Sequence, residues 1–166
     1  MPEYLIRPAT EADLPDLARM RVELRDFLGS CDPDVWQISD SKADALADFY
    51  RDIINTDTAR IFVATNSDSS PVGMLMVRVL ENRNIKPGRF GRIDDAWVDP
   101  EHRRRGLMRR LTRAAAGFCQ ELGVERVMLD WAIRNPDSEK CWTRLGFKPV
   151  VTIGNSLVSN ILDRTS

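Results

Sequence analysis

The residues whose types and spacing point most directly to chemistry lie between Val98 and Met108, where three arginines and a glycine follow a proline turn. The apolar stretch 93–98 predicts a strand that ends before Pro100, and a helical pattern begins after Gly106. Such a loop directs backbone N–H groups toward one point, where the positive end of the helix dipole also lies. The sequence therefore predicts an anion site, and the anion that fits it is a phosphate.

Arginines are concentrated around this loop. Six of them fall within eleven residues of a chain whose formal net charge is only -1: Arg103, Arg104, Arg105, Arg109, Arg110 and Arg113. Cations beside a helix N-terminus oppose the helix dipole unless an anion joins them, so a bound polyphosphate would cancel a local cost. Nucleic acid is not expected as a partner, because the chain as a whole is near neutral and no aromatic residues are interleaved with the cluster.

Two motifs in the second half of the chain resemble those of the GCN5-related N-acetyltransferase (GNAT) family. The first, Arg103-x-x-Gly106-x-Met108, is similar to the family's acyl-CoA pyrophosphate loop, Gln/Arg-x-x-Gly-x-Gly/Ala. The second, Asn135-x-x-Ser138-x-x-x-Trp142-x-x-x-Gly146-Phe147, is similar to Asn-x-x-Ala-x-x-x-Tyr-x-x-x-Gly-Phe. With their flanking elements they cover nearly the whole chain. Met108 departs from the small residue of the loop, and Trp142 departs from the tyrosine that protonates the departing thiolate, which an indole cannot do.

The resemblance implies an acetyl-CoA-dependent N-acetyltransferase with a primary amine of a small molecule or protein as acceptor. The backbone of Ala96, Trp97 and Val98 would bind the pantetheine arm. The pyrophosphate would be bound by Arg103, Arg104, Arg105, Gly106, Leu107, Met108 and Arg109. Asn135, Ser138 and Trp142 would contact the same cosubstrate from the next helix. The alternative is a module that binds acyl-CoA as a sensor without turnover.

Three aspartates are candidates for removing the amine proton: Asp94, Asp95 and Asp130. At pH 7 only about one alkylamine molecule in two thousand is neutral, so a proton must leave before the amine attacks the thioester. Asp94 and Asp95 directly precede the part of the strand assigned to the cosubstrate, and strand alternation predicts that only one of them faces the acceptor. The alternative role for either is structural, as a partner of Arg92 or as a turn cap.

Residues 31–57 carry seven aspartates against Lys42 and Arg51. In the resembled family this region walls the acceptor site, so Asp32, Asp34 and Trp36, together with Asp94, are the candidate substrate residues. We hypothesise that the acids attract a cationic amine such as a polyamine, an aminoglycoside or a lysine side chain. The alternative is that Asp44, Asp48 and Asp52, four residues apart, form a solvated helix face.

A sheet flanked by helices must position these groups. Alternation and turn residues predict strands at 3–7, 59–65, 71–80, 90–98 and 124–132, with a penultimate strand after Gly146-Phe147 and a last one at 156–162. Helical spacing predicts helices at 14–28, 42–54, 109–123 and 136–145. With the resemblance, this gives an α/β (α+β) fold: one domain over 1–166, with a mixed, mostly antiparallel sheet of six to seven strands, a splayed parallel pair and about four helices.

Composition narrows the remaining classes. The chain is 43% hydrophobic and 30% charged, as in globular proteins, and it has no membrane-span or signal pattern. We therefore expect a cytoplasmic protein with no membrane partner. Cys31, Cys119, Cys141 and the single His102 lack metal-ligand spacing, so no metal is expected. The last predicted strand could close a homodimer, as last strands do in some members of the resembled family.

Overall fold

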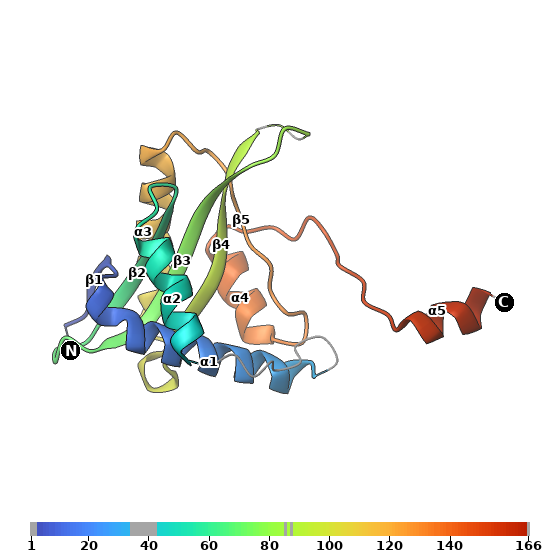
Figure 1. The fold of residues 1–166 in the computed structure, drawn as a ribbon, viewed down its shortest axis with the longest axis horizontal. Coiled ribbons are helices and arrows are strands. Elements are labelled where there is room, and N and C mark those ends of the chain that lie inside the picture. Colours follow the sequence, from blue (N-terminus) through green and yellow to red (C-terminus); the bar gives the residue numbers. More distant parts are fainter. Residues whose placement is uncertain (1–2, 34–42, 85, 87, 166) are drawn as a thin grey trace.

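The computed structural model describes residues 3–33, 43–84, 86 and 88–165. The first half of this part of the chain contains β1 (Leu5–Pro8), the 3-10 turn η1 (Glu11–Asp13), α1 (Leu14–Cys31), α2 (Ala43–Ile54), β2 (Ala59–Thr65) and β3 (Pro71–Glu81). The second half contains β4 (Arg89–Val98), η2 (Pro100–His102), α3 (Leu107–Glu121), β5 (Val127–Met128), α4 (Pro136–Arg144) and α5 (Val158–Thr165). Figure 1 shows their arrangement.

The strands form one sheet in the order β1-β2-β3-β4-β5. The first four strands make an antiparallel meander, and β5 pairs with β4 in parallel after the α3 crossover. The predicted class, a mixed and mostly antiparallel sheet with a parallel pair, is confirmed. The sheet has five strands among the described residues, fewer than the six to seven predicted.

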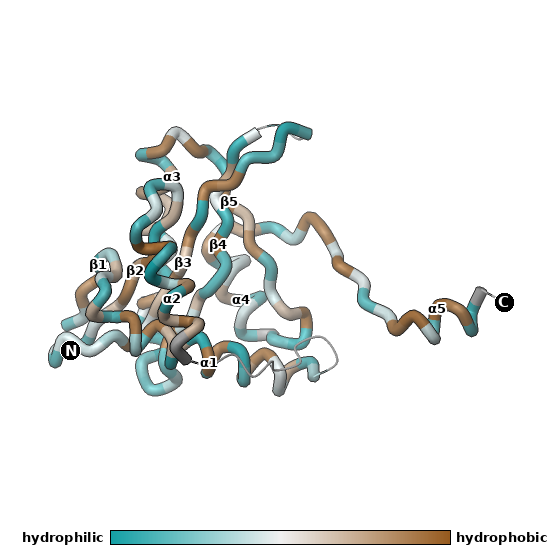
Figure 2. Tube along the Cα trace, in the orientation of Figure 1, coloured by the Kyte–Doolittle hydropathy of each residue, from teal (hydrophilic) through white to brown (hydrophobic). Residues whose placement is uncertain are grey.

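Successive side chains along a strand point to opposite faces of the sheet, and both faces are apolar here because the central strands are largely apolar. In β3, Leu75 and Val77 belong to the core covered by α3 and α4, whereas Met74 and Met76 belong to the core covered by α1 and α2. Figure 2 shows the hydrophobic stretches along these central strands. The two cores hold the helices against the two faces of the sheet. We call the face covered by α1 and α2 the α1/α2 face.

Thr10 and Asp13 form a capping box just before α1. The Asp13 carboxylate accepts hydrogen bonds from the Thr10 backbone N–H at 2.8 Å and from the Arg7 guanidinium at 2.7 and 2.8 Å. These bonds tie the start of α1 to β1. The helix then continues through Gly29, where the sequence predicted its end, to Cys31.

The two C-terminal strands predicted after Gly146 are wrong. Residues 147–157 form no strand, and 158–165 form the helix α5, which lies away from the sheet (Figure 1). Pro149 cannot donate a ladder hydrogen bond. Leu157, Val158, Ile161 and Leu162 recur at helical rather than strand spacing, which explains the helix. The predicted strand 124–132 is also shorter, because only Val127 and Met128 pair with β4.

No helix in the described part of the chain combines the length and the apolar composition needed to cross a bilayer.

Candidate functional site

The loop between β4 and α3 has the backbone shape of an anion cradle. Arg104 and Gly106 both have positive φ, 61° and 75°, and Gly106 caps α3. The first helical hydrogen bond of this end runs from the Arg110 N–H to the Gly106 oxygen at 3.2 Å. Among the described residues, none accepts a hydrogen bond from the six consecutive N–H groups of 104–109. Six donors at the positive end of a helix are what an oxyanion requires.

The side chains of this loop divide into two sets. Arg104, Arg105 and Arg109 are exposed, whereas Leu107 is buried and Met108 packs against the core under α3. The Met108 side chain therefore does not occupy the open side of the loop, although it replaces a small residue of the motif.

Arg103 turns back from the loop. Its Nε donates to the Val98 oxygen at 2.9 Å, and its guanidinium carbon lies 4.7 Å from the centre of the Trp97 ring and 5.5 Å from that of Phe27. These contacts hold the end of β4 against α1 by a hydrogen bond and by cation–π attraction. The structure thus engages Arg103 in an internal contact, and its predicted role at the pyrophosphate remains untested.

The edge of β4 opens beyond Arg92. Gly91 and Arg92 are the last residues that pair with β5, so residues 93–98 have no strand partner on that side among the described residues. The Asp99 N–H donates to the Val72 oxygen of β3 at 2.9 Å. Because N–H groups alternate along a strand, the Val98 N–H points to the opposite, open edge. The predicted splay of a parallel pair is therefore present, with a backbone donor on it.

A β-bulge places both Asp94 and Asp95 on the α1/α2 face. Leu75 pairs with Ala96 but Val77 pairs with Ile93, so β4 has one extra residue opposite Met76. Asp94 contacts Arg78, which alternates with Met76, and Asp95 contacts α1 and α2. The expectation that these two neighbours face opposite sides is wrong, because a bulge interrupts the alternation.

Asp95 is buried between two helices. Only 2% of the residue is exposed, its Oδ1 is paired with Arg21 of α1, and its Oδ2 accepts from the Tyr50 hydroxyl of α2 at 2.8 Å. Burial raises the pKa of Asp95, and the Arg21 charge and the Tyr50 hydrogen bond oppose that rise without cancelling it. Burial and the adjacent carboxylate also raise the pKa of Tyr50, which keeps its hydroxyl protonated as a donor.

Asp94 and Asp130 belong to a second ionic group at the splay. The Arg78 Nε donates to Asp94 Oδ2 at 2.7 Å, and the Arg92 Nε lies 3.6 Å from Asp94 Oδ1. Arg92 also pairs with Asp130, whose side chain is exposed, so it bridges β4 and the segment after β5. All three candidate bases are thus near one another, and each contacts an arginine.

Arg21, Tyr50, Arg78 and Arg92 are the residues of this face to which the sequence assigned no site role. Arg21 and Tyr50 come from helices whose apolar periodicity indicated only packing. Arg78 could have been found, since it is a charged residue within the otherwise apolar run of β3.

The predicted substrate residues are only partly described. Asp32 lies 3.6 Å from Arg134, so the end of α1 contacts the loop before α4. Asp34 and Trp36 lie outside the described residues. On α2, Asp48 pairs with Arg51, and Asp52 is exposed, which agrees with a solvated helix face. The acidic wall remains a prediction.

The three residues in and just before α4 that are predicted to contact the cosubstrate make contacts within the protein. The Asn135 Oδ1 accepts from the Ser138 N–H at 3.2 Å and caps the helix. Trp142 is 6% exposed and packs edge-to-face on Phe147, with ring centres 5.7 Å apart. Trp142 is therefore a core residue, and contact of these three residues with a cosubstrate stays a prediction.

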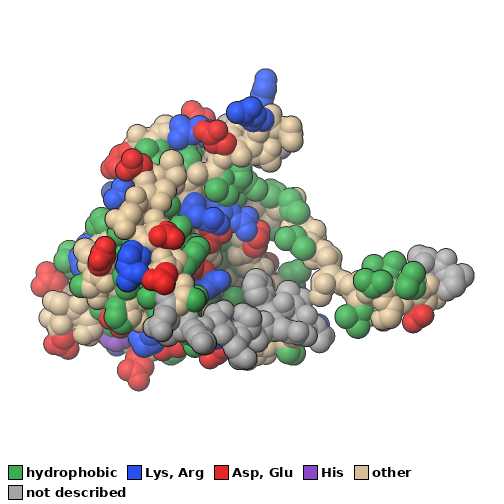
Figure 3. All heavy atoms as spheres, viewed as in Figure 1, with side chains coloured by type: hydrophobic (Ala, Val, Ile, Leu, Met, Phe, Trp, Pro, Cys, Tyr) green, Lys and Arg blue, Asp and Glu red, His purple; other side chains and the backbone are tan. Residues whose placement is uncertain are grey.

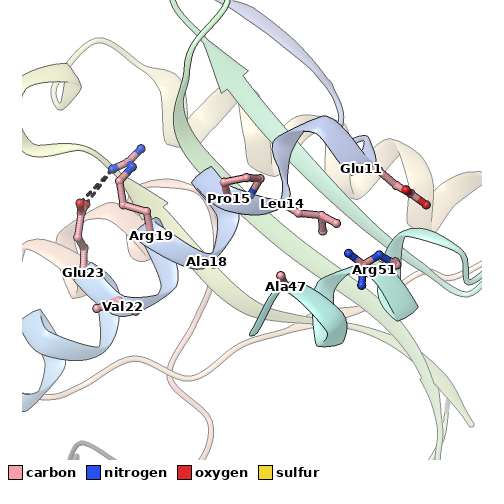
Figure 4. Close-up of a pocket in the computed structure, with 9 residues that line it drawn as sticks. All are labelled: Glu11, Leu14, Pro15, Ala18, Arg19, Val22, Glu23, Ala47 and Arg51. Atoms are coloured by element: carbon pink, nitrogen blue, oxygen red, sulfur yellow. Dashed lines mark hydrogen bonds and ion pairs between the residues drawn. The ribbon is translucent and has the colours of Figure 1, made fainter. Parts of the chain in front are cut away.

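A surface groove of about 650 Å³ runs between α1 and α2 (Figure 4). Leu14, Ala18 and Ala47 line it, with Arg51 and the Arg19–Glu23 pair at its rim. It includes none of the residues predicted to bind or react. In the part of the chain that the structure describes, no three His, Cys, Asp or Glu side chains are grouped to hold a metal ion.

Known proteins resemble this chain in sequence and in fold. The model of the acetyltransferase (GNAT) family matches residues 21–147. Mycothiol acetyltransferase from Pseudarthrobacter chlorophenolicus is 30% identical over 151 residues, which are 82% of this chain and 46% of that protein. This chain thus spans about half the length of that curated relative.

Two solved structures illustrate the shared fold. An aminoglycoside 6'-N-acetyltransferase from Acinetobacter baumannii superposes with a TM-score of 0.72 at 18% identity, covering 93% of this chain and 99% of that one. A predicted acetyltransferase from Clostridium acetobutylicum, solved with acetyl-CoA, gives a TM-score of 0.72 at 13% identity, covering 95% of this chain and 98% of that one. At these identities the comparison concerns the fold alone.

Proposed function

This chain belongs to the acetyltransferase (GNAT) family, and from that premise we propose that it transfers an acetyl group from acetyl-CoA to a primary amine. The observation that carries the proposal is the row of six N–H groups in 104–109 without an acceptor among the described residues. An acyl-CoA sensor would use the same loop, so binding alone does not separate the two functions. Transfer requires, in addition, an amine-dependent release of thiol.

The residues of the loop fit a diphosphate in charge and in geometry. Backbone N–H groups of 104–109 would bind its oxygens, and the exposed Arg104, Arg105 and Arg109 would balance its charge. Acetyl-CoA supplies an activated acyl group as a thioester when it is bound. The Val98 N–H, on the open edge of β4, would donate to a carbonyl oxygen and to the oxyanion that forms from it.

Asp94 is the carboxylate we assign to proton removal from the amine. It lies at the splay and its side chain is 19% exposed, whereas that of Asp95 is 3% exposed and enclosed by Arg21 and Tyr50. Asp130 is farther along, on the segment after β5, and is held by Arg92. A carboxylate in this position can take the proton directly or through one water molecule.

The loop is tested with Gly106→Val. Any side chain at 106 must adopt a φ near 75°, which L-residues rarely do, so the cradle should change shape. We expect calorimetry to show CoA affinity at least about 10-fold weaker. Gly117→Ala is the matched control, because Gly117 lies on α3 with no atom near an added Cβ. Unchanged affinity in Gly106→Val would contradict the proposed binding mode.

The reaction is tested separately from binding. Thiol release is followed with acetyl-CoA and a panel of primary amines. Amine-dependent release supports transfer. Binding of acetyl-CoA without release by any amine would instead favour the sensor.

A further inference from the structure

Arg21 is the part of the Arg21–Asp95–Tyr50 cluster that reaches the surface. The Asp95 side chain is 3% exposed and Tyr50 is fully buried, but the Arg21 side chain is 40% exposed. The pair with Asp95 uses the terminal NH1 nitrogen of Arg21. No described residue accepts a hydrogen bond from its Nε or NH2, so part of its planar fork remains available.

Holding an exposed arginine with a buried carboxylate costs free energy. Burying the charge of Asp95 has a desolvation cost, and an apolar contact between α1, α2 and β4 would avoid it. The effect of the buried carboxylate is geometric. The Tyr50 hydroxyl fixes the orientation of the Asp95 carboxylate, and Asp95 fixes that of the Arg21 guanidinium. A guanidinium held in one orientation binds a planar oxyanion with little further loss of side-chain entropy.

The carboxylates around Arg21 are already paired with arginines, whereas some of the arginine donors remain unused. On the α1/α2 face near the splay, Arg21, Arg78 and Arg92 stand against Asp94, Asp95 and Asp130, and each of these aspartates already contacts an arginine. Figure 3 shows basic and acidic side chains together over the sheet on this side. Each guanidinium has five N–H donors, so these arginines have more donors than the three carboxylates use.

We propose that the acceptor amine carries an oxyanion, a carboxylate or a phosphate, which Arg21 binds on the α1/α2 face of the sheet. Asp95 and Tyr50 are then positioning residues, and the acceptor is zwitterionic rather than a polycation. This inference rests on the proposed acetyl transfer and narrows its substrate class.

Matched acceptors test the inference. Thiol release is measured with short amino acids, with their amides, which lack the carboxylate, with aminoalkyl phosphates and with the parent alkylamines. We expect kcat/KM for at least one oxyanion-bearing amine to exceed that of its analogue without the oxyanion by about 10-fold or more. The carboxylate and phosphate series show which oxyanion is preferred.

Arg21→Lys shows whether this preference arises at Arg21. Lysine keeps a positive charge beside Asp95, so the fold should persist, but it loses the fork. The ratio of kcat/KM between the oxyanion-bearing acceptor and its analogue without the oxyanion should fall about 10-fold, mainly through KM, with the analogue changed less than about 3-fold. Arg51→Lys is the control, because Arg51 lines the separate groove between α1 and α2.

The outcomes separate this inference from the proposed function. Equal rates for acceptors with and without an oxyanion in the wild type would overturn the inference and leave acetyl transfer intact. An unchanged ratio in Arg21→Lys would do the same. Absence of thiol release with every amine, in a protein that binds acetyl-CoA, would contradict both the proposed acetyl transfer and the inference about its acceptor.

Discussion

At the scale of single residues, Asp94 and Asp95 are neighbours with different surroundings. The bulge in β4 turns both toward the α1/α2 face, but Asp95 lies under α1 and α2 whereas Asp94 remains partly accessible. We therefore assign proton transfer to Asp94 and positioning to Asp95. Burial, rather than order in the sequence, separates the two roles.

Asp94→Asn should lower kcat/KM by about 100-fold or more, because a positioned base contributes roughly that much. The amide keeps the shape of the side chain and can still accept a hydrogen bond from Arg78, but it cannot take a proton. Thiol release with acetyl-CoA and an accepted amine gives kcat/KM for both proteins. Asp48→Asn, on the exposed side of α2, should match the wild type. A variant that keeps the wild-type rate would exclude Asp94 from proton transfer.

The sequence predicted which residues lie together in this region better than which face of the sheet their side chains occupy. Asp94, Asp95 and Asp130 do lie together, because β4 and β5 are adjacent parallel strands. The pattern of residue types could not reveal the bulge, since one inserted residue changes the facing of a side chain without changing the apolar character of the strand. The sequence indicated no site role for Arg21 and Tyr50, because tertiary packing, not local spacing, brings α1, α2 and β4 together.

At the scale of elements, the packing of α3 on β4 determines where the sheet opens. A Cβ added to Gly91 would lie 2.6 Å from the Cys119 Sγ and 3.3 Å from Val127 Cγ2. Gly91 is also one of the two β4 residues that pair with β5. The missing side chain thus lets α3 and β5 approach the strand just before the splay.

Gly91→Ala should reduce the free energy of unfolding by about 1–3 kcal/mol, because the added methyl group overpacks this contact. Urea unfolding measures the change. In the background of Cys119→Ala, which removes the Sγ, the same substitution should cost less, and the difference is the coupling energy of the pair. Gly117→Ala should instead stabilise the protein by about 0.5–1 kcal/mol, since it replaces an unhindered glycine within α3. Equal effects of Gly91→Ala in both backgrounds would refute the contact.

The elements were predicted best where periodicity and tertiary structure agree. β2, β3 and β4 lie within about one residue of their predicted limits, and α3 begins directly after the glycine of the loop. Beyond Gly146, apolar residues indicated strands, although helical spacing was also present at 157–162. A short apolar run does not by itself distinguish a strand from a helix, and here the helix forms.

At the scale of the whole molecule, the cluster of Arg21, Asp95 and Tyr50 joins three elements around one buried charge. It connects α1 and α2 to β4 on the same face as the proposed acceptor site. Beyond Phe147, which packs against the core covered by α3 and α4, Val150, Val151, Ile153, Leu157 and Val158 are exposed, and α5 lies away from the sheet (Figure 1). The homodimer expected from the sequence remains a prediction.

The buried charge should make the stability of the molecule depend on pH. The pKa of Asp95 is raised above its ordinary value of 3.8, so between that value and the folded pKa the folded state holds a proton that the unfolded chain has lost. The contribution of this group to stability therefore falls as pH rises through that window and is constant above it. The Tyr50 hydrogen bond favours the carboxylate and limits this loss.

Tyr50→Phe removes that hydrogen bond and keeps the ring, so the folded pKa of Asp95 should rise further. The variant should be less stable than the wild type by about 1–3 kcal/mol at pH 7, and the difference should shrink as pH falls and Asp95 takes up a proton in the folded state. Urea unfolding at several pH values measures this. Tyr4→Phe is the matched control, because the Tyr4 hydroxyl contacts His102 at 2.9 Å and no carboxylate. If the deficit of Tyr50→Phe did not shrink as pH falls below 7, the hydroxyl would not act on the ionised form of Asp95. Asp95 would then hold Arg21 without help from Tyr50.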